Sequence, residues 1–330
     1  MNELCELGDE PGVFPGLPGR YRQVMTIALG VDLGGTKIEI IALDESGAVL
    51  LRRRRPSPRD GYQATLEAIY GLVLDAEAEL GEPASVGFGT PGAISPATGL
   101  LKNSNLTWLN GRPLHEDLAR ALDRPIAIAN DADCLALSEA TDGAAAGASN
   151  VFAVILGTGV GGGLAIHGRV VAGPNAITGE WGHNPLPWPT AEEQPGPRCY
   201  CGLCGCIETW LCGPGLARDF RARAVIERDP PAIVRSAASG DPDAEAALQR
   251  YENRLARALA TVVNLMDPEV VVLGGGLSRL ERLYANVPRI WDRYVFSDVV
   301  RTRLMPAMHG DSSGVRGAAW LGRTAVHRAA

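Results

Sequence analysis

Apolar residues along this chain of 330 residues gather in short runs, and glycine-rich turns separate many of these runs. Three strands are predicted near the beginning, over 25–33, 37–44 and 49–55, with the first turn at Gly34-Gly35. The same order of strand, glycine-rich turn, strand, turn and strand starts again about 125 residues later, with Gly161, Gly162 and Gly163 predicted to form its first turn. This repeat predicts an α/β protein of two similar halves with a cleft between them.

The remaining elements divide the chain into two lobes. Apolar residues at helical spacing predict helices over 62–80, 131–146 and 242–266, and short apolar runs predict strands over 85–89, 125–130 and 270–278. Residues 1–24 are rich in Gly and Pro and are expected to be a disordered tail. We therefore expect a small lobe over 25–130 and a large lobe over 131–314. A C-terminal helix over about 315–330 is expected to pack back onto the small lobe.

Composition and charge exclude some classes of function. The chain has 38 acidic and 31 basic residues, and its net charge of −7 argues against a broad surface for nucleic acid or anionic membrane. The run of arginines at 52–55 is expected to be a solvated strand end. No apolar stretch reaches ~18 residues, so no transmembrane helix is expected. The acidic start is unlike a signal peptide, which predicts a cytoplasmic protein with reduced thiols.

Glycine-rich loops suggest phosphate binding without a dinucleotide fold. GFGTPG at 87–92 and GTGVGG at 157–162 match G-x-G-x-x-G, but neither is followed by the helix that a Rossmann fingerprint needs. The chain also lacks a Walker A sequence. A glycine-rich hairpin can still present backbone N–H groups to phosphate oxygens. Each loop alone is best explained as a tight turn, but three such loops and the repeat together favour nucleotide phosphates.

Several acidic residues are candidates for chemistry. Asn130-Asp131 lies where a predicted strand meets a helix, and the carboxyl ends of strands line the ligand crevice in open α/β sheets. Taken alone, the position of Asp131 favours a helix N-cap over a catalytic role. Phosphoryl transfer needs a carboxylate base and metal-neutralised phosphates, so Asp131 is the candidate base and Asp32 would orient Mg²⁺ through water. Glu180, His183 and Glu208 are further candidates, with surface charge or a core histidine as the alternative.

Four of the seven cysteines lie within CYCGLCGC at 199–206, sixteen residues after His183. Reduced cysteines at this density usually bind zinc, and a disulfide pair is the alternative that a cytoplasmic location disfavours. A closed structural zinc site takes four ligands, whereas His183 and the four cysteines offer five. The spacing alone leaves the spare ligand open. Cys5, Cys134 and Cys212 are expected to be tail or buried thiols.

Taken together, the motifs resemble the ROK family of sugar kinases. The matching stretches occur in order from about residue 25 onward: GVDLGGTK (30–37), GFGTPG (87–92), NDADCLALSEA (130–140), GTGVGGG (157–163), GEWGH (179–183), CYCGLCGCIE (199–208) and LGGGLS (273–278). The stretches KNSNLTWLNG, SEATDGAAAG, GEWGHNPLPW and HGDSSGVRGAAW resemble bacterial ROK-type fructokinases more closely than the other branches.

The resemblance implies a two-lobed actin-like (ribonuclease H-like) fold with ATP and sugar in the cleft, and Asp131 as the base. It implies sugar contacts by Asn105, Asn130, Asp131, Glu180, His183 and Glu208. It implies nucleotide contacts by Asp32, Gly34, Gly35, Thr36, Lys37, Thr158, Gly159, Gly161, Gly162 and Gly275. The family pattern C-x-C-G-x-x-G-C implies that Cys199, Cys201 and Cys206 join His183 around a structural zinc, which leaves Cys204 as the spare cysteine.

The implied function is an ATP-dependent hexose kinase that uses Mg²⁺, forms a homodimer and acts as a fructokinase making fructose 6-phosphate. Mannose, glucose or N-acetylglucosamine is the alternative acceptor. The family also contains sugar-responsive repressors, but these carry an N-terminal helix-turn-helix domain, and only about 24 Gly- and Pro-rich residues precede the first predicted strand. A zinc-dependent redox protein would leave the glycine-rich repeat and Asp131 unexplained.

Overall fold

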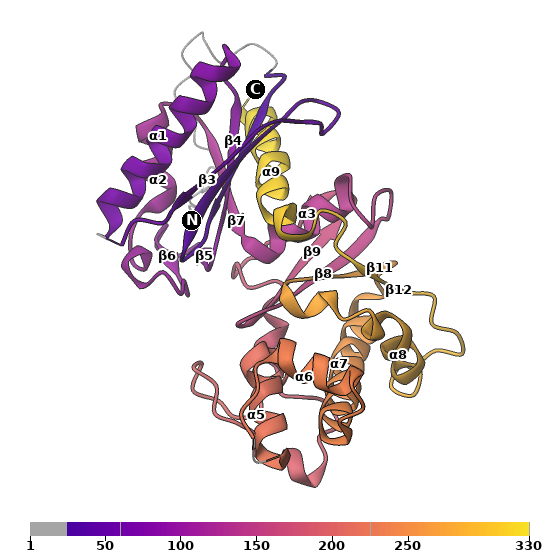
Figure 1. Ribbon diagram of the computed structural model, residues 1–330. Coiled ribbons are helices and arrows are strands. Elements are labelled where there is room, and N and C mark those ends of the chain that lie inside the picture. The colour runs from indigo at the N-terminus through magenta and orange to yellow at the C-terminus, as the bar shows by residue number, and fades with distance from the viewer. Residues whose placement is uncertain (1–24, 60, 225, 330) are drawn as a thin grey trace, which may run out of the picture.

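The computed structural model describes residues 25–59, 61–224 and 226–329. The predicted tail, residues 1–24, lies outside the described residues. The molecule has two lobes that meet in the middle of the view in Figure 1, and each lobe is built on a five-stranded sheet.

The first sheet has the strand order β3-β2-β1-β4-β7. Its strands are β1 (Ala28–Leu33), β2 (Lys37–Leu43), β3 (Val49–Pro56), β4 (Ser85–Thr90) and β7 (Ile126–Asn130). β2 is antiparallel to both β1 and β3, whereas β4 is parallel to β1 and β7 is parallel to β4. Helices α1 (Tyr62–Leu80) and α2 (Leu114–Leu122) bury Leu72 and Leu118 in one apolar core with the sheet, because their apolar residues recur at helical spacing.

The second sheet repeats this arrangement with the order β10-β9-β8-β11-β12. Its strands are β8 (Asn150–Leu156), β9 (Val160–Ile166), β10 (Arg169–Val170), β11 (Val270–Gly274) and β12 (Arg303–Pro306). β8, β9 and β10 form antiparallel pairs, and β11 runs parallel to both β8 and β12, as in the first sheet. The duplicated α/β halves predicted from the sequence are therefore confirmed, and the chain has the two-lobed actin-like fold.

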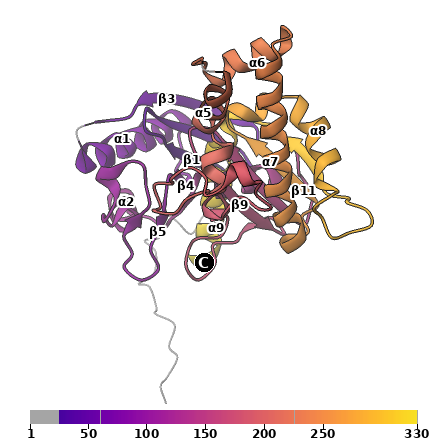
Figure 2. The ribbon, with the colours of Figure 1, turned by 90° about the horizontal axis from the view of Figure 1, so that it is seen from below.

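Four helices share an apolar core with the second sheet and form the outer part of the large lobe (Figure 2). They are α5 (Gly213–Ala224), α6 (Pro230–Ala238), α7 (Pro242–Met266) and α8 (Arg282–Trp291). The predicted apolar face of α7 is buried throughout, from Leu248 to Val262. The loops hold short elements: β5 (Ala93–Ile94), β6 (Leu101–Lys102), α4 (Ile207–Leu211), and the 3-10 helices η2 (Thr107–Leu109), η3 (Glu180–His183), η4 (Ala191–Glu193), η5 (Gly276–Arg279) and η6 (Gly310–Ser312).

One predicted turn is wrong. Gly161, Gly162 and Gly163 lie within β9, and the turn before that strand is formed by residues 157–159. Gly162 and Gly163 are needed for tertiary packing, because a Cβ on Gly162 would lie 2.6 Å from Trp181 and a Cβ on Gly163 would lie 2.2 Å from the carbonyl oxygen of Ala132. Glycine in a strand often marks such a close approach.

Helix α3 (Asp131–Thr141) is shorter than the predicted 131–146. The buried carboxylate of Glu139 accepts hydrogen bonds from the backbone N–H of Ala144 at 2.7 Å and from the hydroxyl of Ser313 at 2.8 Å. A backbone N–H that is bonded to a side chain is not available for the next turn of a helix. The carboxylate therefore shapes the turn that follows α3 and ties it to the C-terminal part of the chain.

Helices α3 and α9 (Ser313–Ala329) connect the two lobes. α9 packs against β1, β4 and β7 of the first sheet and against α3, which in turn packs on β8 and β9 of the second (Figure 1). Glycines allow these close approaches. A Cβ on Gly87 of β4 would lie 2.0 Å from the carbonyl oxygen of Ala318, and a Cβ on Gly317 of α9 would lie 1.7 Å from that of Cys134.

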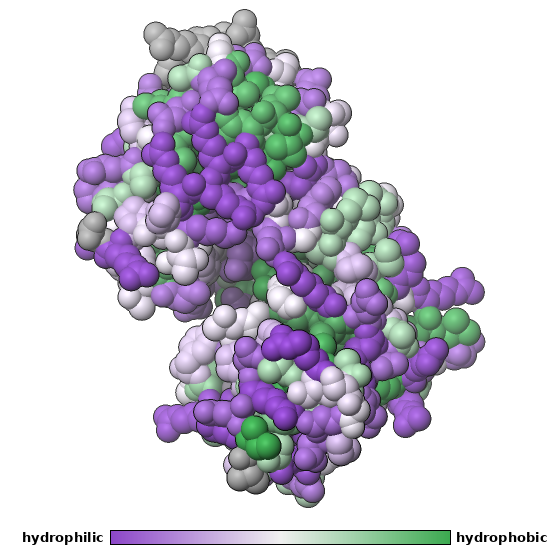
Figure 3. Space-filling model, in the orientation of Figure 1, coloured by the Kyte–Doolittle hydropathy of each residue, from purple (hydrophilic) through white to green (hydrophobic). Residues whose placement is uncertain are grey.

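The four consecutive arginines of β3 are all paired. Arg52 and Arg54 both donate to the buried carboxylate of Glu39 at 2.7 Å on one face of the sheet. The other two contact acidic side chains of α1, Arg53 with Glu79 and Arg55 with Asp75. Hydrophilic residues also cover much of the face shown in Figure 3. No helix in the described part of the chain is both long and apolar enough to span a membrane.

Candidate active site and metal centre

Asp131 is the first residue of α3, directly after the end of β7. Asn130 caps the helix, since its side chain accepts a hydrogen bond from the Ala132 N–H at 2.9 Å and donates one to the carbonyl oxygen of Gly92 at 3.2 Å. Burial raises the pKa of Asp131 to about 6; the N–H of Ala132 lowers it, and Glu180 raises it further. A carboxylate whose pKa approaches neutrality is suited to accept a proton.

Asp32 lies near the end of β1, and burial raises its pKa to about 7, with further increases from Asp131 and Glu39. The ammonium group of Lys37 lowers this pKa. A carboxyl group that is hard to ionise because it is buried and has acidic neighbours suits a nearby cation, which would favour its charged form. The residues around Asp32 therefore fit Mg²⁺. Gly35 and Thr36, in the turn that follows Asp32, are exposed and present backbone to the solvent.

The second glycine-rich hairpin contacts Glu208 of α4. The N–H of Val160 donates to Oε2 of Glu208 at 3.1 Å, and a Cβ on Gly159 would lie 2.9 Å from the same oxygen. Thr158 is exposed at the tip of this hairpin, whereas Gly161 and Gly162 lie further along, in β9. Gly275 follows β11 with a φ of 83°, and its Cβ would lie 2.5 Å from the carbonyl oxygen of Leu156.

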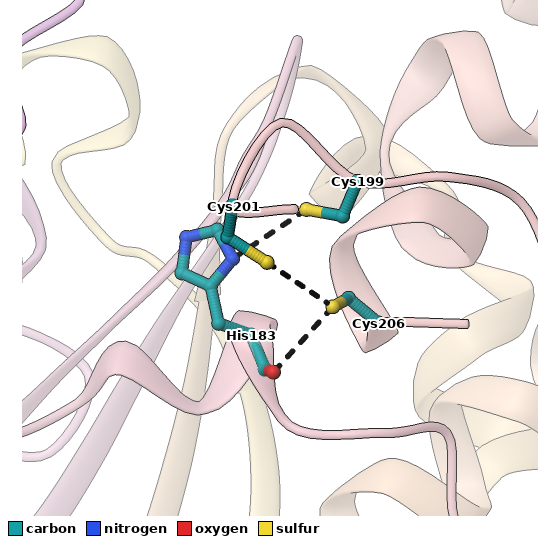
Figure 4. Close-up of side chains that lie close together, drawn as sticks. All are labelled: His183, Cys199, Cys201 and Cys206. Carbon is teal, nitrogen blue, oxygen red and sulfur yellow. Dashed lines mark hydrogen bonds between the residues drawn. The ribbon is translucent and has the colours of Figure 1, made fainter. Parts of the chain in front are cut away.

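His183, Cys199, Cys201 and Cys206 form a group whose ligand atoms all lie within 4.8 Å of one another (Figure 4). Nδ1 of His183 is 3.6 Å from Sγ of Cys199, and Sγ of Cys201 is 3.6 Å from Sγ of Cys206. Zinc bonds of about 2.3 Å to sulfur and about 2.0 Å to nitrogen give tetrahedral edges of this length. The residues therefore fit a zinc ion, and they are the four that the family resemblance selects. Cys204 is exposed and lies outside this group.

Two candidate sugar ligands, Glu180 and Glu208, lie close to the group formed by His183 and the three cysteines. Nε2 of His183 lies 2.9 Å from the hydroxyl of Tyr200 and 3.9 Å from a carboxylate oxygen of Glu180. Sγ of Cys199 lies 3.9 Å from Oε1 of Glu208. His183 therefore faces the thiols with one ring nitrogen and Glu180 with the other. Sequence analysis missed Tyr200, whose only signal is its position between two of the cysteines.

Asn130 and Glu180 line one cavity, and Glu180 lies close to His183. Asn105 is exposed in the loop between β6 and η2, and among the described residues it shares no hydrogen bond with Glu180, His183 or Glu208. Cys134 and Cys212 are buried free thiols, as predicted, whereas Cys5 lies outside the described residues. A cavity of about 990 Å³ opens beside Asn130 and Glu180.

Comparisons with known proteins agree with this geometry. A model of the ROK family matches residues 28–325. N-acetyl-D-glucosamine kinase from Escherichia coli O127:H6 is 39% identical over 88% of this chain and 98% of its own length. The crystal structure of the ROK hexokinase from Thermus thermophilus superposes with a TM-score of 0.81 at 32% identity, over 92% of this chain and 99% of the other. A ROK family glucokinase from Streptomyces griseus, in complex with glucose and AMPPNP, gives a TM-score of 0.72 at 26% identity, over 90% and 99% of the two chains. The chain therefore belongs to the ROK family, and it is a sugar kinase of that family.

Proposed function

We propose that this protein is an ATP-dependent hexose kinase whose favoured acceptor is N-acetylglucosamine. The observation that carries the proposal is the 39% identity to an N-acetyl-D-glucosamine kinase over nearly the whole of that relative, together with Asp131 at the start of α3. The relatives thus favour the alternative acceptor of the sequence analysis and give no support to fructose. The glucokinase that contains glucose and AMPPNP supports a nucleoside triphosphate as the donor.

In this proposal Asp131 accepts the proton of the sugar hydroxyl while the hydroxyl oxygen attacks the γ-phosphorus of ATP. The bond between the γ-phosphorus and the β,γ-bridging oxygen breaks, so the phosphoryl group passes to the sugar and ADP leaves. Asn105, Asn130, Glu180, His183 and Glu208 hold the sugar, and His183 does so through Nε2 because its Nδ1 faces the thiols. Residues 34–37 hold the phosphates from the first lobe, and Thr158, Gly159, Gly161 and Gly162 hold them from the second. Gly275 lies beside the nucleotide base. Mg²⁺, when bound, neutralises phosphate charge, and Asp32 would hold it through water.

We further propose a structural zinc held by His183, Cys199, Cys201 and Cys206. The ion would then link the segments that carry the two carboxylates. His183 belongs to η3 with Glu180, and Cys206 directly precedes α4, which carries Glu208. Metal affinity and folding of such a site are coupled, so zinc would stabilise the arrangement of both carboxylates. The homodimer stays a prediction, which light scattering on the purified protein would test.

A coupled assay of ADP release tests the acceptor. The wild-type enzyme is compared on N-acetylglucosamine, N-acetylmannosamine, glucose, mannose and fructose, with the Asp131→Asn variant as the control for background ATP hydrolysis. N-acetylglucosamine is expected to give the highest kcat/KM. A higher value with fructose would restore the fructokinase hypothesis, and release of ADP at the same rate in the variant would contradict the role of Asp131.

A further inference from the structure

Nε2 of His183 is the ring nitrogen that the proposed function assigns to the sugar. The other nitrogen, Nδ1, lies 3.6 Å from Sγ of Cys199, and Nε2 points away from the three cysteines in Figure 4. A carboxylate oxygen of Glu180, another proposed sugar ligand, lies 3.9 Å from Nε2. Nε2 is thus the atom through which His183 reaches the proposed sugar site.

The side chain of Tyr200 occupies this nitrogen. Its hydroxyl lies 2.9 Å from Nε2 of His183, and the two rings pack edge to face with their centroids 5.1 Å apart. An imidazole nitrogen offers one hydrogen-bonding position in the plane of the ring, as a donor or as an acceptor. A sugar hydroxyl can therefore bind Nε2 only after the hydroxyl of Tyr200 has left it.

Tyr200 can leave His183 without rearrangement of its loop. The residue is 79% exposed, and in the described part of the chain its hydroxyl makes no other hydrogen bond. The backbone around it is held separately, because the N–H of Gly202 donates to the carbonyl oxygen of Cys199 at 3.1 Å and the N–H of Cys199 donates to that of Leu203 at 2.8 Å. Rotation of the side chain into solvent breaks the contact with His183 and leaves these backbone bonds intact.

We propose that the hydroxyl of Tyr200 takes the place of a sugar hydroxyl at Nε2 of His183 before sugar binds, and that the sugar displaces it. This inference rests on the proposed function, in which Nε2 holds the sugar. Tyr200 is then a positioning residue that acts through His183 and sets the affinity for sugar. The apparent affinity is the intrinsic affinity multiplied by the fraction of molecules in which Nε2 is free.

Tyr200→Phe tests this competition, since it removes the hydroxyl and keeps the ring. The sugar used is the acceptor that gives the highest kcat/KM. We expect its dissociation constant, measured by calorimetry without ATP, to fall about two- to tenfold, which is the net contribution of one hydrogen bond. KM should fall with it, whereas kcat should stay within about twofold, because the hydroxyl has left His183 in the ternary complex of both proteins.

Leu203→Ala is the matched control for changes in the loop. Leu203 is exposed in the same loop, and it is its backbone carbonyl that bonds to Cys199. The dissociation constant for sugar is expected to stay within about twofold of wild type in this variant. An equal fall in both variants would overturn the proposal, because the effect would then belong to the loop and not to the hydroxyl.

An unchanged or larger dissociation constant in Tyr200→Phe would also overturn the proposal, since it would mean that the hydroxyl does not compete with the sugar. If the best acceptor is not N-acetylglucosamine, the proposed acceptor is wrong. The direction of the change in Tyr200→Phe still decides the competition at Nε2 with whichever sugar binds, so the two failures are distinguishable.

Magnetic resonance of the protein with its tyrosine intact does not depend on how the variants fold. A ¹³C label is placed at Cζ of Tyr200 alone, and the protein is titrated with the sugar. The chemical shift is expected to move toward that of free tyrosine in water as the sugar saturates the site, because the hydroxyl passes from His183 to solvent. A shift that stays the same, or moves away from the value for free tyrosine, would overturn the displacement.

Discussion

Replacing Gly317 by alanine is expected to force apart the two helices that join the lobes. The added Cβ would lie 1.7 Å from the carbonyl oxygen of Cys134 in α3, whereas ordinary van der Waals contact begins at 3.4 Å. Both partners are helical backbone, so α9 has to move by well over 1 Å. Gly314, in the same helix, is the matched control, because no other described atom lies within 4 Å of the Cβ that alanine would add there.

The magnitudes of the two effects follow from packing and helix propensity. Overpacking a buried contact costs about 1–3 kcal/mol, and alanine regains about 0.8–1 kcal/mol over glycine in a helix. Since backbone atoms collide, we expect Gly317→Ala to lose about 2 kcal/mol of unfolding free energy and Gly314→Ala to gain up to about 1 kcal/mol. Urea unfolding of both variants beside wild type measures the difference. An unchanged midpoint in Gly317→Ala, or equal losses in both variants, would refute the reasoning.

Three other predictions concern the chemistry. Asp131→Asn is expected to lower kcat by about 10²–10⁴-fold at an unchanged melting temperature, because an amide cannot accept the hydroxyl proton; turnover above about a tenth of wild type would exclude Asp131 as the base. Burial, opposed by the Ala132 N–H and reinforced by Glu180, raises the pKa of Asp131 to about 6, and only the ionised form is a base. The kcat/KM of the wild type should therefore fall about tenfold per unit below about pH 6, and a flat profile to about pH 5 would contradict this. Metal analysis should find zinc lost from Cys201→Ser and retained in Cys204→Ser; the reverse pattern would overturn the ligand set.

Local sequence signals were enough to predict most strands and the helices α1, α3, α7 and α9, whereas α2, α4, α5, α6 and α8 were not predicted. The bounds of α7, for example, agree with the predicted 242–266, because Asp241 caps the helix and Pro242 occupies its first position. The repeat of glycine-rich hairpins likewise predicted the two sheets. Such signals come from residues close together in the chain, and they report backbone preference directly.

The errors arose where a residue serves a distant part of the chain. The glycines at 161–163 suggested a turn, but Gly162 and Gly163 are required by Trp181 and Ala132, which only the folded chain brings against β9. The early end of α3 depends on Glu139, whose carboxylate also binds Ser313 near the C-terminus. Neither reason can be read from a window of neighbouring residues.

The candidate site shows the same division. Asp131 could be selected because its position between a strand and a helix is visible in the sequence. Tyr200 could not, since its hydroxyl comes within 2.9 Å of Nε2 of His183 only in the folded chain. The spacing of the cysteines left five ligands for four places, and only the family resemblance and then the folded geometry separate Cys204 from the other four.

Glu208 connects the metal cluster to the rest of the candidate site. One of its oxygens accepts the Val160 N–H beside the second hairpin, and the other lies 3.9 Å from Sγ of Cys199. Cys206 directly precedes α4, so the position of Glu208 also depends on the group of proposed zinc ligands. Loss of zinc would free the start of α4, and movement of Glu208 would then alter the contact with the hairpin. We therefore expect zinc removal to weaken ATP binding as well as sugar binding, although none of the four proposed zinc ligands belongs to that hairpin.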